Sequence, residues 1–151
     1  EKYGEEEGTR RIKEVKNNGI HMNNHSKISL LLFDALSEYS TSYGSNEEVI
    51  SLTEDEYSQC GMWNIKPDFL FGNKIIEFYG DRFHGNPELF ADEDCCHPFN
   101  SSLTAMDMKN RDEKRNNILT ERGYSVKIVW ENDFRKNADR IIDECKDFLT
   151  S

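Results

Sequence analysis

The chain of 151 residues has few cysteines, little positive charge and no long hydrophobic run. No apolar run approaches the roughly 18 residues that a membrane-spanning helix needs, and no signal peptide is visible, so we expect no membrane association. The 4 cysteines are too irregularly spaced for a disulfide framework, which favours a reducing, cytoplasmic setting. Only 36% of the residues are hydrophobic, but they cluster, and the length suits one domain.

The shortage of positive charge bears on the kind of partner. A formal net charge of −10 argues against a protein that coats nucleic acid by bulk electrostatics, because the phosphate backbone attracts basic surfaces. It does not exclude an enzyme that acts on nucleic acid. A carboxylate cluster can hold a metal in an acidic domain to which a more basic module delivers the substrate.

Residues 1–25 are polar and are expected to form an arm or linker, followed by a folded domain over residues 26–151. Apolar residues at helical spacing predict helices over Ser26–Tyr39, Thr104–Arg122 and Lys136–Leu149. Alternating or apolar runs predict strands over Glu48–Leu52, Trp63–Phe71, Lys74–Tyr79 and Tyr124–Glu131. The connections Thr53–Gly61 and Gly80–Ser102 are expected to be irregular. This order predicts an α/β domain with a mixed sheet flanked by helices.

The most informative stretch runs from Lys66 to Pro87. Gly72-Asn73 is a two-residue hairpin turn of the kind that begins with glycine. The register that this turn sets places Asp68 opposite Glu77, with their Cβ atoms about 5 Å apart. Like charges in this position destabilise a sheet, and a divalent cation that accepts carboxylate oxygens offsets the repulsion. The stretch therefore predicts a site for Mg²⁺ or Mn²⁺ on Asp68 and Glu77.

The helix expected over Thr104–Arg122 carries charges on its apolar face. Asp112 and Arg115 share a stripe with Met108 and Leu119. Two interpretations stay open at this point. The charges either pair with each other along the helix, or they are directed at the hairpin as a carboxylate and a guanidinium.

Two other groups of residues could bind metal, and both are weak candidates. Cys95, Cys96 and His97 are adjacent in the chain, and neighbouring cysteines chelate one metal poorly. His21 and His25 have helical spacing, but the flanking asparagines favour a loop.

The motifs resemble a known family. Pro67-Asp68 on one strand and Glu77 on the next are similar to the acidic core of the PD-(D/E)XK nuclease superfamily. The continuation I-I-E-F-Y-G-D-R-F-H-G-N-P, a later D-x-x-R, and G-Y-S-V-K-I-V-W-E resemble the very-short-patch-repair-like nucleases. The closest branch is the phage and virus homing endonucleases known by an E-D-x-H-D motif. The resemblance covers roughly Ser26–Phe134 and implies a PD-(D/E)XK-type mixed sheet flanked by helices.

The resemblance implies metal-dependent cleavage of double-stranded DNA at phosphodiester bonds. It assigns catalytic roles to Asp68, Glu77, His84 and Asp112, of which Asp68 and Glu77 would hold Mg²⁺ or Mn²⁺. For His84 this role is proton transfer or contact with the scissile phosphate, and Asp112 would orient His84 or a second hydrated metal.

Further residues of the same motifs are candidates for binding the substrate. Arg115 matches the D-x-x-R arginine and, with Lys109 nearby, could contact phosphate oxygens. Phe83 is a candidate wedge against bases, although a lone aromatic residue is more often part of a core. Asn86 could orient the backbone or the substrate, and Asp81 is expected to serve the turn rather than to bind metal.

The sequence departs from the family pattern at two places. Tyr79 stands where the parent superfamily has a lysine, so proton transfer is expected to depend more on His84. The first helix continues S-K-I-S with L-L-L-F and has no acid before Asp34, where relatives carry a glutamate.

The setting that the resemblance implies is a phage-encoded chain acting in the cytoplasm of an infected host. The arm Y-G-E-E-E-G-T-R-R resembles a segment that precedes such domains in phage proteins, which predicts a separate DNA-recognition module in a longer chain. The alternatives are a strand-nicking enzyme of the mismatch-repair type, or a catalytically inactive module for DNA binding or assembly.

Overall fold

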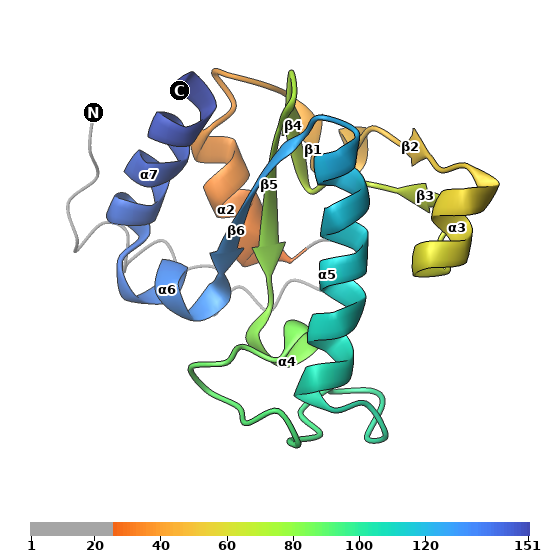
Figure 1. The fold of residues 1–151 in the computed structure, drawn as a ribbon. Coiled ribbons are helices and arrows are strands. Elements are labelled where there is room, and N and C mark those ends of the chain that lie inside the picture. The colour runs from red at the N-terminus through yellow and green to blue at the C-terminus, as the bar shows by residue number, and fades with distance from the viewer. Residues whose placement is uncertain (1–25) are drawn as a thin grey trace.

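The computed structural model describes residues 26–151 (Figure 1). The polar arm expected over residues 1–25, with His21 and His25, lies outside the described residues. The main sheet has the strand order β1-β4-β5-β6. Its strands are β1 (Ser42–Tyr43), β4 (Phe69–Phe71), β5 (Lys74–Tyr79) and β6 (Ser125–Trp130). Because β5 and β6 are parallel and the other pairs are antiparallel, the sheet is mixed, as expected.

The hairpin between β4 and β5 has the predicted register. Phe69 pairs with Ile76, and Phe71 pairs with Lys74. Gly72 has a φ of +59°, in the left-handed region, while Asn73 does not have positive φ, so a glycine is needed at the first turn position only.

The strand predicted over Trp63–Phe71 is divided in two. Its first part, β3 (Asn64–Ile65), pairs with β2 (Ile50–Ser51) in a separate small sheet. The chain then leaves the ladder and rejoins the main sheet at Phe69. Asp68 therefore lies just before β4, at the place where β5 continues without an antiparallel partner.

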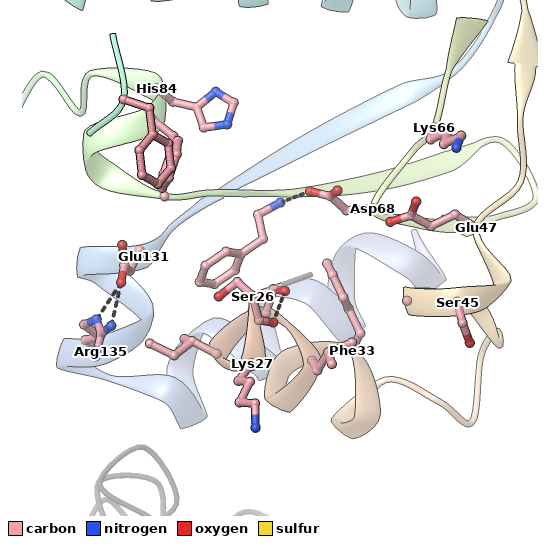
Figure 2. A pocket seen from close by; sticks show the side chains of 18 of the residues that line it. Ser26, Lys27, Phe33, Ser45, Glu47, Lys66, Asp68, His84, Glu131 and Arg135 are labelled. Carbon is pink, nitrogen blue, oxygen red and sulfur yellow. Dashed lines mark hydrogen bonds and ion pairs between the residues drawn. The ribbon is translucent and has the colours of Figure 1, made fainter. Parts of the chain in front are cut away.

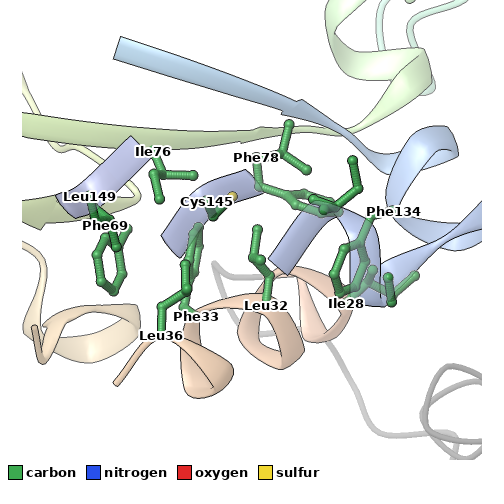
Figure 3. Packing of buried hydrophobic residues seen from close by; sticks show 13 residues of the cluster. Ile28, Leu32, Phe33, Leu36, Phe69, Ile76, Phe78, Phe134, Cys145 and Leu149 are labelled. Atoms are coloured by element: carbon green, nitrogen blue, oxygen red, sulfur yellow. The ribbon is translucent and has the colours of Figure 1, made fainter. Parts of the chain in front are cut away.

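The two faces of the main sheet are covered by different helices (Figure 1). On one face, α2 (Lys27–Ala35) and α7 (Ala138–Thr150) pack against Phe69, Ile76 and Phe78 in an apolar cluster (Figure 3). On the other, α5 (Ala105–Glu121) packs its Ile118 and Leu119 against Leu70 and Ile75.

A small lobe made of β2, β3 and α3 (Glu54–Cys60) extends beside α5 (Figure 1). The expectation of an irregular segment over Thr53–Gly61 is wrong, because Thr53 and Glu56 form a capping box that starts a helix. Arg122 holds the lobe to the end of α5 through Glu56 at 2.6 Å and the carbonyl of Ser51 at 2.8 Å.

The C-terminal part contains two helices where one was expected. The predicted helix over Lys136–Leu149 corresponds to α7, and α6 (Glu131–Lys136) precedes it. Asn137 separates them, because its side chain accepts a hydrogen bond from the Arg140 N–H and caps α7. The connection expected to be irregular after Gly80 begins with the short helix α4 (Asp81–His84). No helix in residues 26–151 has the length and apolar character needed to cross a membrane.

Candidate active site

The candidate site lies where β5 ends and α4 begins. Gly85 closes α4 with a φ of +62°, and a Cβ atom there would lie 2.8 Å from the Cα of Ala105. Only glycine therefore lets α4 approach the first turn of α5 so closely. This contact brings His84, the last residue of α4, alongside α5.

His84 is held between two partners. Its Nδ1 lies 2.7 Å from Oδ2 of Asp112 on α5. Its ring stacks on that of Tyr79, with 3.9 Å between the centroids and 5° between the planes. An ionised carboxylate only accepts hydrogen bonds, so Nδ1 is the ring nitrogen that donates to Asp112, and in the neutral imidazole the lone pair is then on Nε2. The arrangement gives His84 one tautomer and one orientation, as a proton-transfer group requires.

Tyr79 is itself fixed, by Asn116 on α5. The Asn116 amide donates to the Tyr79 hydroxyl at 3.0 Å. Burial, and then the charge of Asp112, raise the pKa of Tyr79 far above its ordinary value. Tyr79 therefore serves as a neutral support for the imidazole.

Glu77 lies on β5, buried with 3% exposure. Its Oε1 accepts a hydrogen bond from Nη1 of Arg115 at 2.9 Å. The other Arg115 nitrogen, Nη2, lies 3.4 Å from the carbonyl of Lys66. Burial, together with the charge of Asp68 and a hydrogen bond to it, raises the pKa of Glu77 well above its ordinary value despite Arg115. Asp68 and Glu77 are therefore close enough for the charge of one to act on the other, as the predicted register implies.

Asp68 is half-buried at the edge of an open cavity of about 1180 Å³, into which His84 also faces (Figure 2). Its Oδ2 accepts a hydrogen bond from the backbone N–H of Phe78 at 2.9 Å. This bond takes the place of a backbone hydrogen bond between β4 and β5, whose pairing ends at Phe69 and Ile76. It fixes Asp68 beside Glu77 and leaves Oδ1 as the oxygen not engaged by this N–H.

The cavity is also lined by charged residues that sequence reasoning did not single out. Lys27 begins α2, Lys66 precedes β4, and Arg135 lies on α6 (Figure 2). Arg135 is paired with Glu131 at 2.6 Å, and the Lys27 ammonium points away from Asp68 and His84 (Figure 2), which leaves Lys66 as the candidate for contacts with phosphate. A sequence signal for Lys66 existed, because it stands two residues before Asp68.

The structure decides between the two interpretations of Asp112 and Arg115. Asp112 contacts His84, and Arg111 at 3.6 Å, whereas Arg115 reaches Glu77. The alternative of a simple Asp–Arg pair along the helix is therefore wrong. Both side chains are directed at β5 and α4, and they account for the charged positions on the apolar face of α5.

Asn86 does not have the predicted substrate-binding position, because it is only 1% exposed. Its amide donates to Oδ1 of Asp81 at 2.9 Å, and its own Oδ1 accepts from the Glu88 N–H at 3.0 Å. Asp81 also accepts from the Asn132 N–H at 3.2 Å. Asn86 therefore orients the backbone after α4, and Asp81 serves the turn as expected.

The remaining candidates lie nearer the surface. Phe83 is partly exposed at the cavity and contacts His97 and Phe99, with ring centroids 5.4 Å and 5.9 Å away. The alternative that Phe83 is a core residue is thus wrong. Lys109 is exposed on α5 and is not among the described residues that line the cavity.

The segment Cys95–His97 is not arranged as a zinc site. Cys96 is buried with its Sγ 3.6 Å from the carbonyl of Arg82, while Cys95 is exposed. Nδ1 of His97 accepts hydrogen bonds from the N–H groups of Phe99 and Asn100, both at 3.1 Å, so this nitrogen is already engaged in a turn.

The donor set at the site suits Mg²⁺ in its chemistry. Within residues 26–151, no three or more His, Cys, Asp or Glu side chains are grouped to hold a metal. Mg²⁺, however, commonly uses one or two carboxylates and completes its shell with water and substrate phosphate. Of the two carboxylates at the site, Asp68 lines the open cavity, whereas Glu77 is buried beside Arg115 and is not among the described residues that line it. The one conflicting contact is that of Arg115 with Oε1 of Glu77.

Comparisons with protein-family models, with curated proteins and with solved structures give no match. The resemblance to a nuclease family therefore stays a prediction.

Proposed function

We propose that this chain is a Mg²⁺- or Mn²⁺-dependent endonuclease that hydrolyses phosphodiester bonds of double-stranded DNA, as the catalytic domain of a homing-type enzyme. One observation carries the proposal. Two adjacent carboxylates, Asp68 and Glu77, and an oriented His84–Asp112 pair meet at the same end of β5. A purely structural role does not require either arrangement.

The carboxylates would hold the metal. A cation bound by Asp68 and Glu77 would polarise the scissile phosphate and supply a hydroxide-like nucleophile from bound water. The backbone N–H of Phe78 keeps the Asp68 carboxylate fixed at the edge of the cavity, so the ligand position exists before the metal arrives.

His84 is the proton-transfer group in this proposal. Nε2 accepts a proton from water or donates one to the leaving oxygen, and Asp112 stabilises the imidazolium through Nδ1. The stacked ring of Tyr79 prevents the imidazole from rotating away.

The substrate would enter the cavity that Asp68 and His84 line. Lys66 can contact phosphate oxygens there. Phe83 and Phe99, the latter 86% exposed, offer apolar rings at the rim for contacts with bases or sugars. The net charge of −10 makes tight binding by this domain alone unexpected, so a separate recognition module stays part of the proposal.

A second candidate function has an observation in its favour. Arg115 already provides Glu77 with a positive partner, as would suit a catalytically inactive module for DNA binding or assembly. A strand-nicking enzyme would use the same residues as the leading proposal and differs from it only in its product.

Incubation of supercoiled plasmid with the protein and Mg²⁺ or Mn²⁺ separates these functions. We expect cleavage that disappears in Asp68→Ala and in Glu77→Ala and persists in Glu113→Ala, which changes an exposed acid on α5. A nicked product alone favours the nickase. DNA retention without cleavage at saturating protein favours the inactive module, and cleavage that survives in Asp68→Ala contradicts the metal assignment.

A further inference from the structure

Arg115 engages the acid that the proposed metal would need. The Nη1–Oε1 distance is 2.9 Å, and the side chains of Arg115 and Glu77 are only 16% and 4% exposed. The pair joins the middle of α5 to β5, between the apolar contacts of Ile75 and the His84–Asp112 pair.

Other arginine–glutamate pairs in the described part of the chain lie nearer to water. Arg122 and Glu56 are 32% and 16% exposed, and Arg135 and Glu131 are 29% and 25% exposed. A charge as buried as that of Glu77 needs a counter-ion, since an unpaired buried carboxylate is strongly unfavourable. Arg115 meets this need in the absence of metal.

A divalent cation and a guanidinium that bind the Glu77 carboxylate weaken each other's binding. Both would bind oxygens of one carboxylate, and their positive charges would repel at short range in a site screened from water. Arg115 also donates a second, longer hydrogen bond, from Nη2 to the Lys66 carbonyl at 3.4 Å, and Lys66 lines the cavity. A small rotation of the guanidinium would break its contact with Glu77 and turn it toward Lys66.

We propose that Arg115 and the divalent cation compete for Glu77, with Arg115 as the resident counter-ion that the cation displaces. This inference rests on the proposed function for the identity of the cation. The displaced guanidinium becomes available to phosphate oxygens of the substrate only after the metal is in place. Arg115 thus links phosphate contact to metal binding.

The first test measures Mn²⁺ affinity by electron paramagnetic resonance of free Mn²⁺, with wild type, Arg115→Met and Arg115→Gln. We expect both variants to bind Mn²⁺ at least about tenfold more tightly, because no internal cation has to leave. Arg122→Met removes an arginine–glutamate pair from the end of the same helix and should leave the affinity unchanged. Equal or weaker binding in the folded Arg115 variants would overturn the inference.

The second test uses the wild-type protein, so it does not depend on the folding of a variant. The side-chain N–H signals of Arg115 are followed by nuclear magnetic resonance during titration with diamagnetic Mg²⁺. We expect these signals to shift and exchange faster, while those of Arg122 stay in place. An Arg115 signal that does not respond as Mg²⁺ saturates the site overturns the competition.

Failure of this inference and failure of the proposed function give different results. Plasmid cleavage with an unchanged Mn²⁺ affinity in the Arg115 variants rejects the competition and keeps the nuclease. Tighter Mn²⁺ binding in those variants without any cleavage by wild type keeps the competition and rejects the nuclease.

Discussion

The two faces of strand β5 differ in what they bury. Ile76 and Phe78 point into a cluster that contains only apolar residues and cysteine, closed by α2, α6 and α7. On the opposite face, Ile75 is followed by Glu77 and Tyr79, which meet polar groups of α5. One strand of six residues thus serves an apolar core on one side and the polar contacts of α5 on the other. The cavity that Asp68 lines opens at the edge of the apolar side, where Ile28, Phe33 and Phe78 also line it.

The difference explains how this domain tolerates buried charges, whose desolvation is unfavourable. The apolar face supplies hydrophobic burial of the kind that stabilises a fold, at about 25 cal/mol for each Å² removed from water. The charged face gains little net stability from a buried ion pair, because desolvation offsets the Coulomb attraction. The four predictions below test this division of roles.

The largest effect is expected from the His84–Asp112 pair. His84→Ala and Asp112→Asn should each lower the rate of DNA cleavage by about 10²- to 10⁴-fold, the usual contribution of a general acid or base. The double variant should be little worse than either single one, because the two residues act as a unit. Cleavage rates on plasmid measure this, with Asp107→Asn, in the first turn of the same helix, as the control. Additive losses would contradict a shared role.

Exchange of the buried ion pair should separate stability from function. Glu77→Leu alone leaves Arg115 without its partner and should lower the free energy of unfolding by about 3–5 kcal/mol. Adding Arg115→Met should restore stability to the wild-type level or above, since apolar pairs often replace buried ion pairs without loss. Urea unfolding followed by circular dichroism measures both, and the double variant should remain unable to cleave DNA. A double variant as unstable as the single one would show that the charged face stabilises the fold.

Divalent cations should stabilise the charged face. At 100 times its dissociation constant, Mg²⁺ or Mn²⁺ should raise the free energy of unfolding by about 2.7 kcal/mol through mass action. Asp68→Asn should remove this gain, and Leu32→Val, in the apolar cluster, should lower stability but keep the gain. Thermal unfolding with metal and with chelator provides the comparison. A gain of the same size in Asp68→Asn would place the metal elsewhere.

The smallest effect is expected in the pH dependence of stability without metal. Burial and Asp68 raise the pKa of Glu77 above its ordinary value of 4.5, so the folded chain holds this proton to higher pH than the unfolded chain. Its contribution to stability is present below pH 4.5 and is lost as the pH rises through the raised pKa.

Glu56 provides the opposite control for that measurement. Hydrogen bonds from Arg122 and the Thr53 backbone lower its pKa to about 2, so its contribution is present above pH 4.5 and is lost as the pH falls toward 2. Urea midpoints in chelator from pH 3 to pH 9 should flatten on the alkaline side in Glu77→Gln and on the acid side in Glu56→Gln. An unchanged alkaline limb in Glu77→Gln would contradict the raised pKa.

The hairpin and the helix faces could be predicted because local rules determine them. The turn at Gly72-Asn73 fixes the register, so the approach of Asp68 to Glu77 followed from counting residues. The polar interruption of the apolar stripe on α5 likewise indicated that Asp112 and Arg115 had partners elsewhere. Their identities required the tertiary structure, because His84 reaches Asp112 only through the packing of Gly85 against Ala105.

Other features lay beyond what these rules can predict. Asn86 is embedded in the turn after α4 because it ties Asp81 to the next backbone N–H, and nothing in its spacing marks it as buried. Lys27 joins the cavity through the docking of α2 across the sheet, which is a long-range contact. The helix α3 was the avoidable error, since Thr53 and Glu56 have the spacing of a capping box.

The order in which the strands of the sheet pair determines when the candidate site is complete. The β4–β5 hairpin is local and can close within about 1–10 μs, whereas β5 pairs in parallel with β6 across the segment that separates Lys74 from Ser125. We expect a newly made chain to bring Asp68 and Glu77 together before α5 delivers Arg115 and Asp112. In the proposed function, the hydrolytic unit would therefore be completed only by the slow, non-local step, and a half-folded chain would not cleave the DNA around it.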